Sequence, residues 1–309
     1  MINRLRKHIK DTILPLVCLL MIACHEKEQP TVPKLVGIEV ISTDHPEFAT
    51  SVNRNSDQIF FNRTTPDRSK MWIMVSQLEN NEWSIPDTLP FSSGLYRDVD
   101  PFLANDDATL FFSSNRPTSN DTDDPGEFNT WYVKKVGDGW SDPVMAPAPL
   151  NSDSTEIFIS IASSGNAYFV SERGGRRGIV RSKLVDGEYQ DVEIIDLKLR
   201  GEVVYASNPC IASDESFLIV ACRDPEGNGR PDLFVSWNQD GQWSEMQNLG
   251  ESVNSPYAEF APGLNKDNQV LYFSSERPGL LPEQAEGVRP PGDIYKVDIQ
   301  AVFEQLGMR

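Results

Sequence analysis

The residues with the clearest chemical potential are arginines and carboxylates that recur along the chain at a regular spacing. Five apolar segments end in Ser-x-Arg or a close variant, and the arginines lie 53, 57, 50 and 54 residues apart. These arginines are Arg63, Arg116, Arg173, Arg223 and Arg277. An acid opens the preceding apolar segment in four units, at Glu47, Asp98, Glu156 and Glu259. Because guanidinium–carboxylate pairs are directional and often bidentate, the first interpretation is structural: the pairs tie neighbouring units together.

The same acids permit a second interpretation, a site around a central channel. The expected ring of channel carboxylates is Glu47, Asp98, Asp100, Glu156 and Glu259. Such a ring could hold a cation or a sugar, and hydrolysis of a glycosidic bond needs two carboxylates across that bond. The fourth unit has Ala206 in the place of the acid. We therefore expect Arg223 either to pair with Asp224 or Asp232 or to contact a ligand.

Other catalytic and metal-binding patterns are weak. Only His25 and His45 follow the first 24 residues, which nearly excludes a Ser-His-Asp triad, and no Cys/His spacing suits zinc. Two acidic loops, at 224–229 and around Asp121, Asp123 and Asp124, could bind calcium weakly, although solvated loops explain them better. The sequence thus predicts no catalytic residue, no metal site and no cofactor.

The elements that position these residues form a repeat. Each unit has a first strand, a turn rich in Asp, Asn and Ser, and the second strand that carries the arginine. A third strand follows, and an aromatic residue opens the fourth: Trp83, Trp140, Tyr189 or Trp243. Four short antiparallel strands every 50 or so residues are typical of a β-propeller, whose blades bury their faces by stacking in a ring.

The two ends of the repeat region give the number of blades. The fifth unit lacks a fourth strand, because residues 301–308 are predicted to form a short amphipathic helix. A strand at 35–41 has no unit of its own and is predicted to complete the last blade. We therefore expect an all-β fold, a five-bladed propeller over residues 35–300 closed by the N-terminal strand, followed by a helix at 301–309. The alternative is a six-bladed propeller with one degenerate blade.

The first residues have the features of a targeting segment. Four basic residues precede an apolar run that is too short to span a bilayer, and Cys24 follows it. Residues 21–24, Met-Ile-Ala-Cys, resemble a lipobox. That resemblance implies a signal peptide at 1–23, lipid attachment to Cys24 and a flexible tether at 24–34. Ordinary signal cleavage with a free Cys24 is the alternative.

Charge and cysteine content restrict the function further. The formal net charge of −18 opposes contact with phosphate backbones, so we expect no nucleic-acid partner. Cys210 and Cys222 flank a turn and are predicted to lie on neighbouring strands. An exported location permits a disulfide between them, but adjacent strands often have unsuitable geometry, and both outcomes stay open.

The repeat resembles the WD40-like PD40 repeats of TolB-type β-propellers. Phe-Ser-Ser-Glu-Arg-Pro at 273–278 with Asp-Ile-Tyr at 293–295 carries the likeness, as does Phe-Ser-Ser-Asn-Arg-Pro at 112–117 with Trp-Tyr at 131–132. The resemblance covers residues 35–298 and implies the fold far more specifically than the function. Members of this group include envelope scaffolds, lipoproteins and propellers attached to peptidases.

These observations together favour a binding role. We expect a monomeric propeller, lipid-anchored to the outer membrane of the cell envelope. It would bind an envelope protein or glycan without catalysis, through loops at one face such as 117–128 and 278–292. A glycan-active hydrolase with carboxylates around the channel is the main alternative, and a purely structural scaffold is a third.

Overall fold

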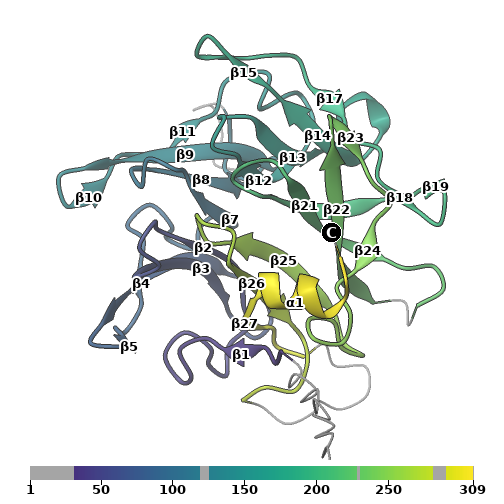
Figure 1. Ribbon diagram of the computed structural model, residues 1–309. Helices are drawn as coiled ribbons and strands as arrows, with labels where there is room; N and C mark the ends of the chain where they lie inside the picture. Colours follow the sequence, from purple (N-terminus) through teal and green to yellow (C-terminus); the bar gives the residue numbers. More distant parts are fainter. Residues whose placement is uncertain (1–30, 119–124, 228–229, 281–289, 309) are drawn as a thin grey trace, which may run out of the picture. The chain divides into compact units, whose positions relative to one another are not determined.

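The computed structural model describes residues 31–118, 125–227, 230–280 and 290–308. The predicted signal peptide, Cys24, most of the tether, Asp121, Asp123, Asp124 and the greater part of the loop at 278–292 lie outside these ranges. The described chain is almost entirely β-structure. Five antiparallel sheets stand in a ring, as the sequence predicts (Figure 1).

Each sheet is one blade, and its strands run outward from the centre in chain order, except that the N-terminal strand is the outermost strand of the last blade. Blade 1 consists of β2 (Glu47–Val52), β3 (Gln58–Thr64), β4 (Met71–Glu79), β5 (Glu82–Trp83) and β6 (Asp87–Thr88). Blade 2 consists of β7 (Asp98–Leu103), β8 (Thr109–Ser114), β9 (Asn129–Val136), β10 (Gly139–Trp140) and β11 (Val144–Met145). Blade 3 consists of β12 (Glu156–Ile161), β13 (Ala167–Ser171), β14 (Gly178–Ser182), β15 (Leu184–Val185), β16 (Glu188–Tyr189) and β17 (Glu193–Ile194). A one-turn 3₁₀ helix, η1 (Arg173–Gly175), follows β13.

The remaining elements complete the ring. A short hairpin of β18 (Lys198–Leu199) and β19 (Glu202–Val203) joins blades 3 and 4. Blade 4 consists of β20 (Ala206–Ile211), β21 (Phe217–Arg223), β22 (Pro231–Gln239), β23 (Gln242–Trp243) and β24 (Gln247–Asn248). Blade 5 consists of β25 (Glu259–Leu264), β26 (Val270–Ser275), β27 (Asp293–Asp298) and β1 (Lys34–Leu35). In blades 1 to 4 the outermost strand is thus split into two short pieces. The aromatic residue predicted to open the fourth strand lies on the first piece in each of these blades.

Pairing of the N-terminal strand with the last blade closes the ring. Strand β1 pairs with β27 in the register Lys34–Lys296 and Leu35–Tyr295, which confirms the predicted closure. The predicted extent of this strand, 35–41, was wrong. The chain turns sharply at Gly37 and Glu39, whose φ angles of 54° and 63° cannot continue a strand. The described chain forms five blades, so the six-bladed alternative is wrong as well.

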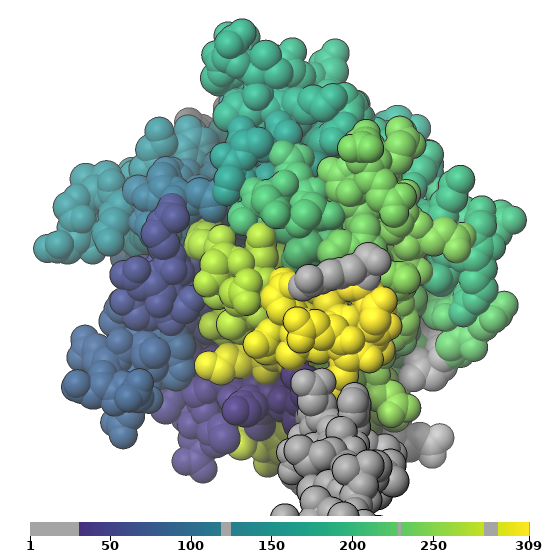
Figure 2. All heavy atoms as spheres, in the orientation of Figure 1, coloured from purple at the N-terminus to yellow at the C-terminus, as the bar shows by residue number. Residues whose placement is uncertain are grey.

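The C-terminal helix packs against the ring at blades 4 and 5. Helix α1 (Ile299–Gln305) lies near the predicted position, and its N-cap Asp298 accepts a hydrogen bond from the N–H of Ala301. The Phe303 ring lies 5.2 Å from that of Phe217 and 4.8 Å from that of Trp237 in blade 4. In Figure 2 the helix is the yellow segment on the surface beside blade 5. The helix thereby covers apolar side chains of blades 4 and 5, next to the short outermost strand β1.

Local backbone geometry explains why the sequence turns where it does. Every predicted turn between first and second strands contains one residue with a positive φ angle: Ser56, Asp107, Gly165, Glu215 and Asn268. Each first strand also contains a β-bulge at its third residue, with φ between 48° and 57°: Ala49, Asp100, Phe158, Asn208 and Ala261. The bulge N–H of Ala49, Asp100 and Phe158 each donates to a side chain in the preceding blade. Bulges therefore lock neighbouring blades together around the axis.

The two cysteines of the propeller are separate buried thiols. Cys210 on β20 pairs in register with Ile219, whereas Cys222 on β21 pairs with Ala206, so they lie at opposite ends of the hairpin. Burial raises the pKa of the Cys210 thiol to about 12 and that of Cys222 to about 11. Of the two outcomes left open by the sequence, the structure has the free thiols.

Candidate functional site

The acid that opens a first strand lies at the centre of a buried hydrogen-bond cluster, seen most completely at Glu259. Its carboxylate is fully buried and accepts from the Ser255 hydroxyl at 2.6 Å and the Ser255 N–H at 2.9 Å. The hydroxyl of Ser275 on β26 donates to it at 2.6 Å, and Nη2 of Arg277 lies 3.2 Å from Oε1. Arg277 also donates to the carbonyl of Val253. The cluster thus fastens the segment that leads into blade 5, residues 253–255, to the first two strands of that blade.

The same cluster is built in blades 1 and 3. Arg173 lies 3.0 Å from Glu156, and Arg63 lies 2.8 Å from Glu47. A hydroxyl four residues before each acid completes it, from Ser152 to Glu156 and from Thr43 to Glu47, each at 2.6 Å. In blade 2, Arg116 and Ser114 hold Asp98 at 2.6 and 2.7 Å. Each ion pair joins residues of a single blade through one carboxylate oxygen, so the expected bidentate links between blades were wrong.

Burial has an electrostatic consequence at two of these acids, Glu47 and Glu259. It raises the pKa of Glu47 to about 7, although hydrogen bonds from Thr43 and the charge of Arg63 oppose the rise. Burial likewise raises the pKa of Glu259 against the hydrogen bonds from Ser255 and Ser275. The four carboxylates are neutralised by arginine inside the protein and do not line the central cavity, which corrects the expected channel ring.

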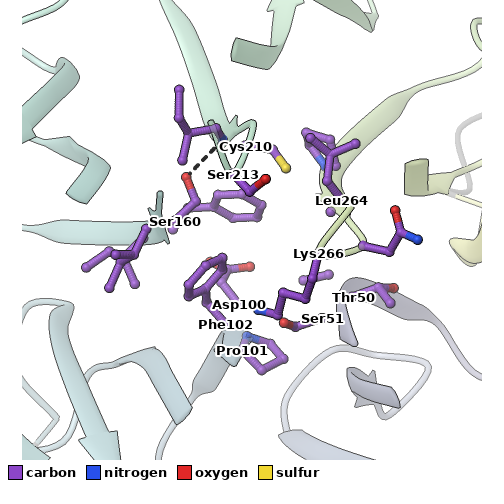
Figure 3. A pocket seen from close by; sticks show the side chains of 18 of the residues that line it. Thr50, Ser51, Asp100, Pro101, Phe102, Ser160, Cys210, Ser213, Leu264 and Lys266 are labelled. Carbon is purple, nitrogen blue, oxygen red and sulfur yellow. Dashed lines mark hydrogen bonds between the residues drawn. The ribbon is translucent and has the colours of Figure 1, made fainter. Parts of the chain in front are cut away.

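Asp100 is the one expected channel acid that lies at the cavity among the described residues. The cavity has a volume of about 40 Å³ and is lined by the first strands of all five blades, whose side chains point toward one another (Figure 3). Burial alone raises the pKa of Asp100 to about 7. The Thr50 hydroxyl, which also lines the cavity, is buried without a hydrogen-bond partner in the described structure. A volume of this size holds a few water molecules and no sugar ring.

Lys266 borders the same cavity and was not anticipated from the sequence. It follows β25, and its ammonium group donates to the carbonyl of Leu103 and lies 5.0 Å from the centre of the Phe102 ring (Figure 3). Burial lowers its pKa to about 8. A cation that borders this cavity opposes the expected cation site in the channel.

Blade 4 departs from the repeat at three positions together. Ala206 replaces the acid that opens the first strand. Its partner in the strand register is Cys222, whereas the acids of the other blades pair with Ser or, in blade 1, with Arg63. Asp224 follows Cys222 by two residues, at the position that Arg173 and Arg277 occupy in blades 3 and 5. The polarity is reversed, because Arg200 binds Asp224 through two hydrogen bonds of 2.8 and 2.6 Å. Arg223 is therefore not the counterpart of the other arginines, as the sequence spacing suggested.

Arg223 instead lines a hollow on the face where the first strands begin, here called the N-terminal face. Of the two acids expected to pair with it, Asp224 binds Arg200, and Asp232 accepts a hydrogen bond from Asn248 at 2.9 Å. The blade 4 hollow has a volume of about 480 Å³, and its lining includes Tyr205, Ser207, Asn208, Ala221, Arg223 and Phe260. A second hollow of about 210 Å³, lined in part by Arg176, Arg177 and Ile179, shares Val204 and Tyr205 with it.

Metal and membrane features were searched in the described residues alone. No group of three or more His, Cys, Asp or Glu side chains there is arranged to hold a metal ion. In the loop at 224–229, Arg200 binds both Asp224 and Glu226, while 228–229 lie outside the description, as does the loop around Asp121. No helix in those same parts of the chain has the length and apolarity to cross a bilayer.

Comparison with solved structures shows the fold. The chain is similar to a thermostable family-43 glycoside hydrolase, with a TM-score of 0.54, 10% identity and coverage of 84% of this chain and 90% of that one. It is also similar to α-L-arabinofuranosidase from Lactobacillus brevis, with a TM-score of 0.51, 12% identity and coverage of 81% and 90%. No family model matches the sequence, and no curated protein sequence does so.

TolB-like propellers are also among the structural neighbours. TolB from Acinetobacter baumannii has a TM-score of 0.46 and 11% identity, over 82% of this chain. The chain spans about half of that protein, 54% of its length. At 10–12% identity the comparisons concern the fold alone and leave the function to the site.

Proposed function

We propose that this protein is a non-catalytic binding module of the cell envelope that recognises another protein. The proposal rests chiefly on where the structure places the repeated acids. Four are held by arginine inside their blades, and the fifth, Asp100, faces a cavity of about 40 Å³ beside Lys266. Ligand pockets usually measure about 300–1,000 Å³. A glycosidase would need two carboxylates facing one accessible cleft, and the described residues offer no such pair at the channel.

The glycan-hydrolase alternative draws its support from the two neighbours with TM-scores above 0.5, both glycosidases by name. Their similarity is at the level of the fold, which many functions share. A partner protein also fits the surface better than a glycan does. The blade 4 hollow carries Tyr, Phe and Arg and no Asp, Glu or Lys among its described lining residues, the composition of a protein interface core.

Attachment to the membrane through Cys24 is part of the proposal and rests on the lipobox-like residues 21–24. A lipid anchor would keep the propeller at the membrane.

The proposal is tested by crosslinking whole cells that produce the full chain with a C-terminal affinity tag. We expect a specific envelope protein to be recovered, and radiolabelled palmitate to enter the wild type but not Cys24→Ala. Recovery of no protein above the level of an unrelated tagged lipoprotein would contradict the binding role. Labelling of both forms would contradict the anchor.

A further inference from the structure

We infer that a groove between blades 5 and 1 is a binding site, and that it takes an acidic segment of the partner protein. The inference rests on the proposed binding function and specifies where the partner makes contact and by what chemistry. The groove, here called the closure groove, lies where the ring closes and has a volume of about 640 Å³, within the usual range of ligand pockets. Its lining includes Lys34, Leu78, Trp83, Tyr272, Lys296 and Asp298.

At two other blade interfaces, a tryptophan on the outermost strand of one blade packs edge-on against a ring on the second strand of the blade before it. The ring centres lie 5.9 Å apart for Trp140 and Phe60, and 6.2 Å apart for Trp243 and Tyr168. Trp83 and Tyr272 occupy the corresponding positions in blades 1 and 5. No ring contact joins these two in the described part of the chain, and both line the closure groove. The space between the outer strands therefore stays open at this interface.

A buried hydroxyl at the closure groove lacks a hydrogen-bond partner. Tyr272 is only 4% exposed, and its hydroxyl forms no hydrogen bond with any residue that the structure describes. Burial raises the pKa of this phenol to about 12, so the group keeps its proton and acts as a donor at neutral pH. Because Tyr272 lines the groove, an acceptor oxygen that enters there can take this hydrogen bond.

Two lysines face the closure groove from neighbouring strands. Lys34 on β1 lies directly opposite Lys296 on β27, which in turn lies opposite Tyr272 on β26, so the three side chains share one face of blade 5. Like charges directly opposite each other destabilise a sheet, and neither lysine forms an ion pair with a described residue. Asp298, the one acid in the described lining, already caps helix α1. A carboxylate between the lysines would offset their repulsion and accept from Tyr272.

The apolar part of the lining favours a peptide over a sugar as the source of this carboxylate. Val32 is 65% exposed at the closure groove, and Leu78 and Trp83 are partly exposed there. Aliphatic surface suits an apolar amino acid side chain better than the hydroxyl-covered ring of an acidic sugar. The expected ligand is therefore a segment with Asp, Glu or a terminal carboxylate next to an aliphatic or aromatic residue.

A displayed library of random 12-residue peptides with free C-termini tests the inference. The full chain is expected to enrich peptides of this composition. The dissociation constant of an enriched peptide should rise at least tenfold in Lys34→Gln/Lys296→Gln and at least threefold in Tyr272→Phe, which removes the hydroxyl alone. Added salt should weaken binding to the wild type more than binding to the double lysine variant.

A matched control is Lys70→Gln/Lys135→Gln, which makes the same change in net charge away from the closure groove. Both lysines are exposed and form no ion pair with a described residue, so peptide affinity should stay within twofold of the wild type. Melting temperatures verify folding. The Lys34→Gln/Lys296→Gln protein should be at least as stable as the wild type, because two opposed charges are removed.

Equal affinity of the groove and control variants would overturn the inference, and the binding function would stand if crosslinking still recovers a partner. Enrichment of peptides without a carboxylate side chain beside an apolar residue would overturn it as well. So would capture of a uronic-acid oligosaccharide through the two groove lysines when no peptide is enriched. Enrichment of no peptide together with recovery of no crosslinked protein would remove the binding function too.

Discussion

Replacement of Glu259 by alanine is the sharpest test of the structural role of the repeated acids. The carboxylate accepts hydrogen bonds from the backbone and hydroxyl of Ser255, the hydroxyl of Ser275 and the guanidinium of Arg277. Its loss leaves four donors without their acceptor and the partly buried Arg277 without its counter-charge. Removal of one partner from a buried ion pair costs about 3–5 kcal/mol. We therefore expect the free energy of unfolding to fall by about 4 kcal/mol.

Urea denaturation followed by tryptophan fluorescence measures this loss, and calorimetry should show a melting temperature lower by roughly 8–12 °C. Glu251→Ala, an exposed acid that precedes the same blade, should change stability by less than about 0.5 kcal/mol. In the double variant Glu259→Ala/Arg277→Ala the loss should be clearly smaller than the sum of the single losses, because one interaction is counted in both. A Glu259→Ala protein within 1 kcal/mol of the wild type would refute the reasoning.

Three further predictions follow from buried groups and ring closure. Burial raises the folded-state pKa of Asp100 to about 7. Ionisation of its carboxyl therefore destabilises the fold as the pH rises from about 4 to above 7. Asp100→Asn should raise the melting temperature at pH 8 and have little effect at pH 4. Asparagine tolerates the φ angle of 57° at this position, so backbone strain does not obscure the comparison. Val36 follows the closing strand β1 directly, and Val36→Pro removes its N–H, which donates to the Ile294 carbonyl at 2.9 Å; it should lower the free energy of unfolding by about 3 kcal/mol in urea titrations, whereas Val32→Pro in the exposed segment should not. In a Cys18→Ser/Cys24→Ser protein, the two remaining thiols should react with a reagent such as dithionitrobenzoate only after unfolding, since Cys210 and Cys222 are buried with raised pKa values; rapid reaction in buffer would contradict their placement.

The repeat predicted much of the fold because each unit contains the same local signals. The Asp- and Asn-rich turns contain a residue with positive φ, and the strand before Glu47 had no partner other than the last blade. The extent of that strand was less predictable, because the turn at Gly37 and Glu39 depends on packing against β27. The β-bulges gave no signal, since Ala, Asp, Phe and Asn occupy equivalent positions.

The site was predictable only in part. A hydroxyl four residues before Glu47, Glu156 and Glu259 was a readable sign that these acids are satisfied internally. Spacing alone wrongly aligned Arg223 with the other repeat arginines, because the arginine does not occupy the same position in every blade. Arg63 pairs with its acid in the strand register, whereas Arg173 and Arg277 come two residues after the serine that pairs with the acid. Arg200 and Tyr205 come from the inserted connection between blades 3 and 4, whose path over blade 4 the sequence does not specify. The blade 4 hollow could not be predicted, because it forms between this connection and strands of blades 4 and 5 that are distant in the sequence.

Hydrolysis of oligosaccharides tests the central claim, binding without catalysis, most directly. The full chain and its Asp100→Asn variant would be incubated with a panel of plant and bacterial oligosaccharides, and the products identified by mass spectrometry. The account predicts no cleavage by either protein above the level of buffer. Cleavage by the wild type that disappears in Asp100→Asn would contradict it and establish a catalytic carboxylate at the channel.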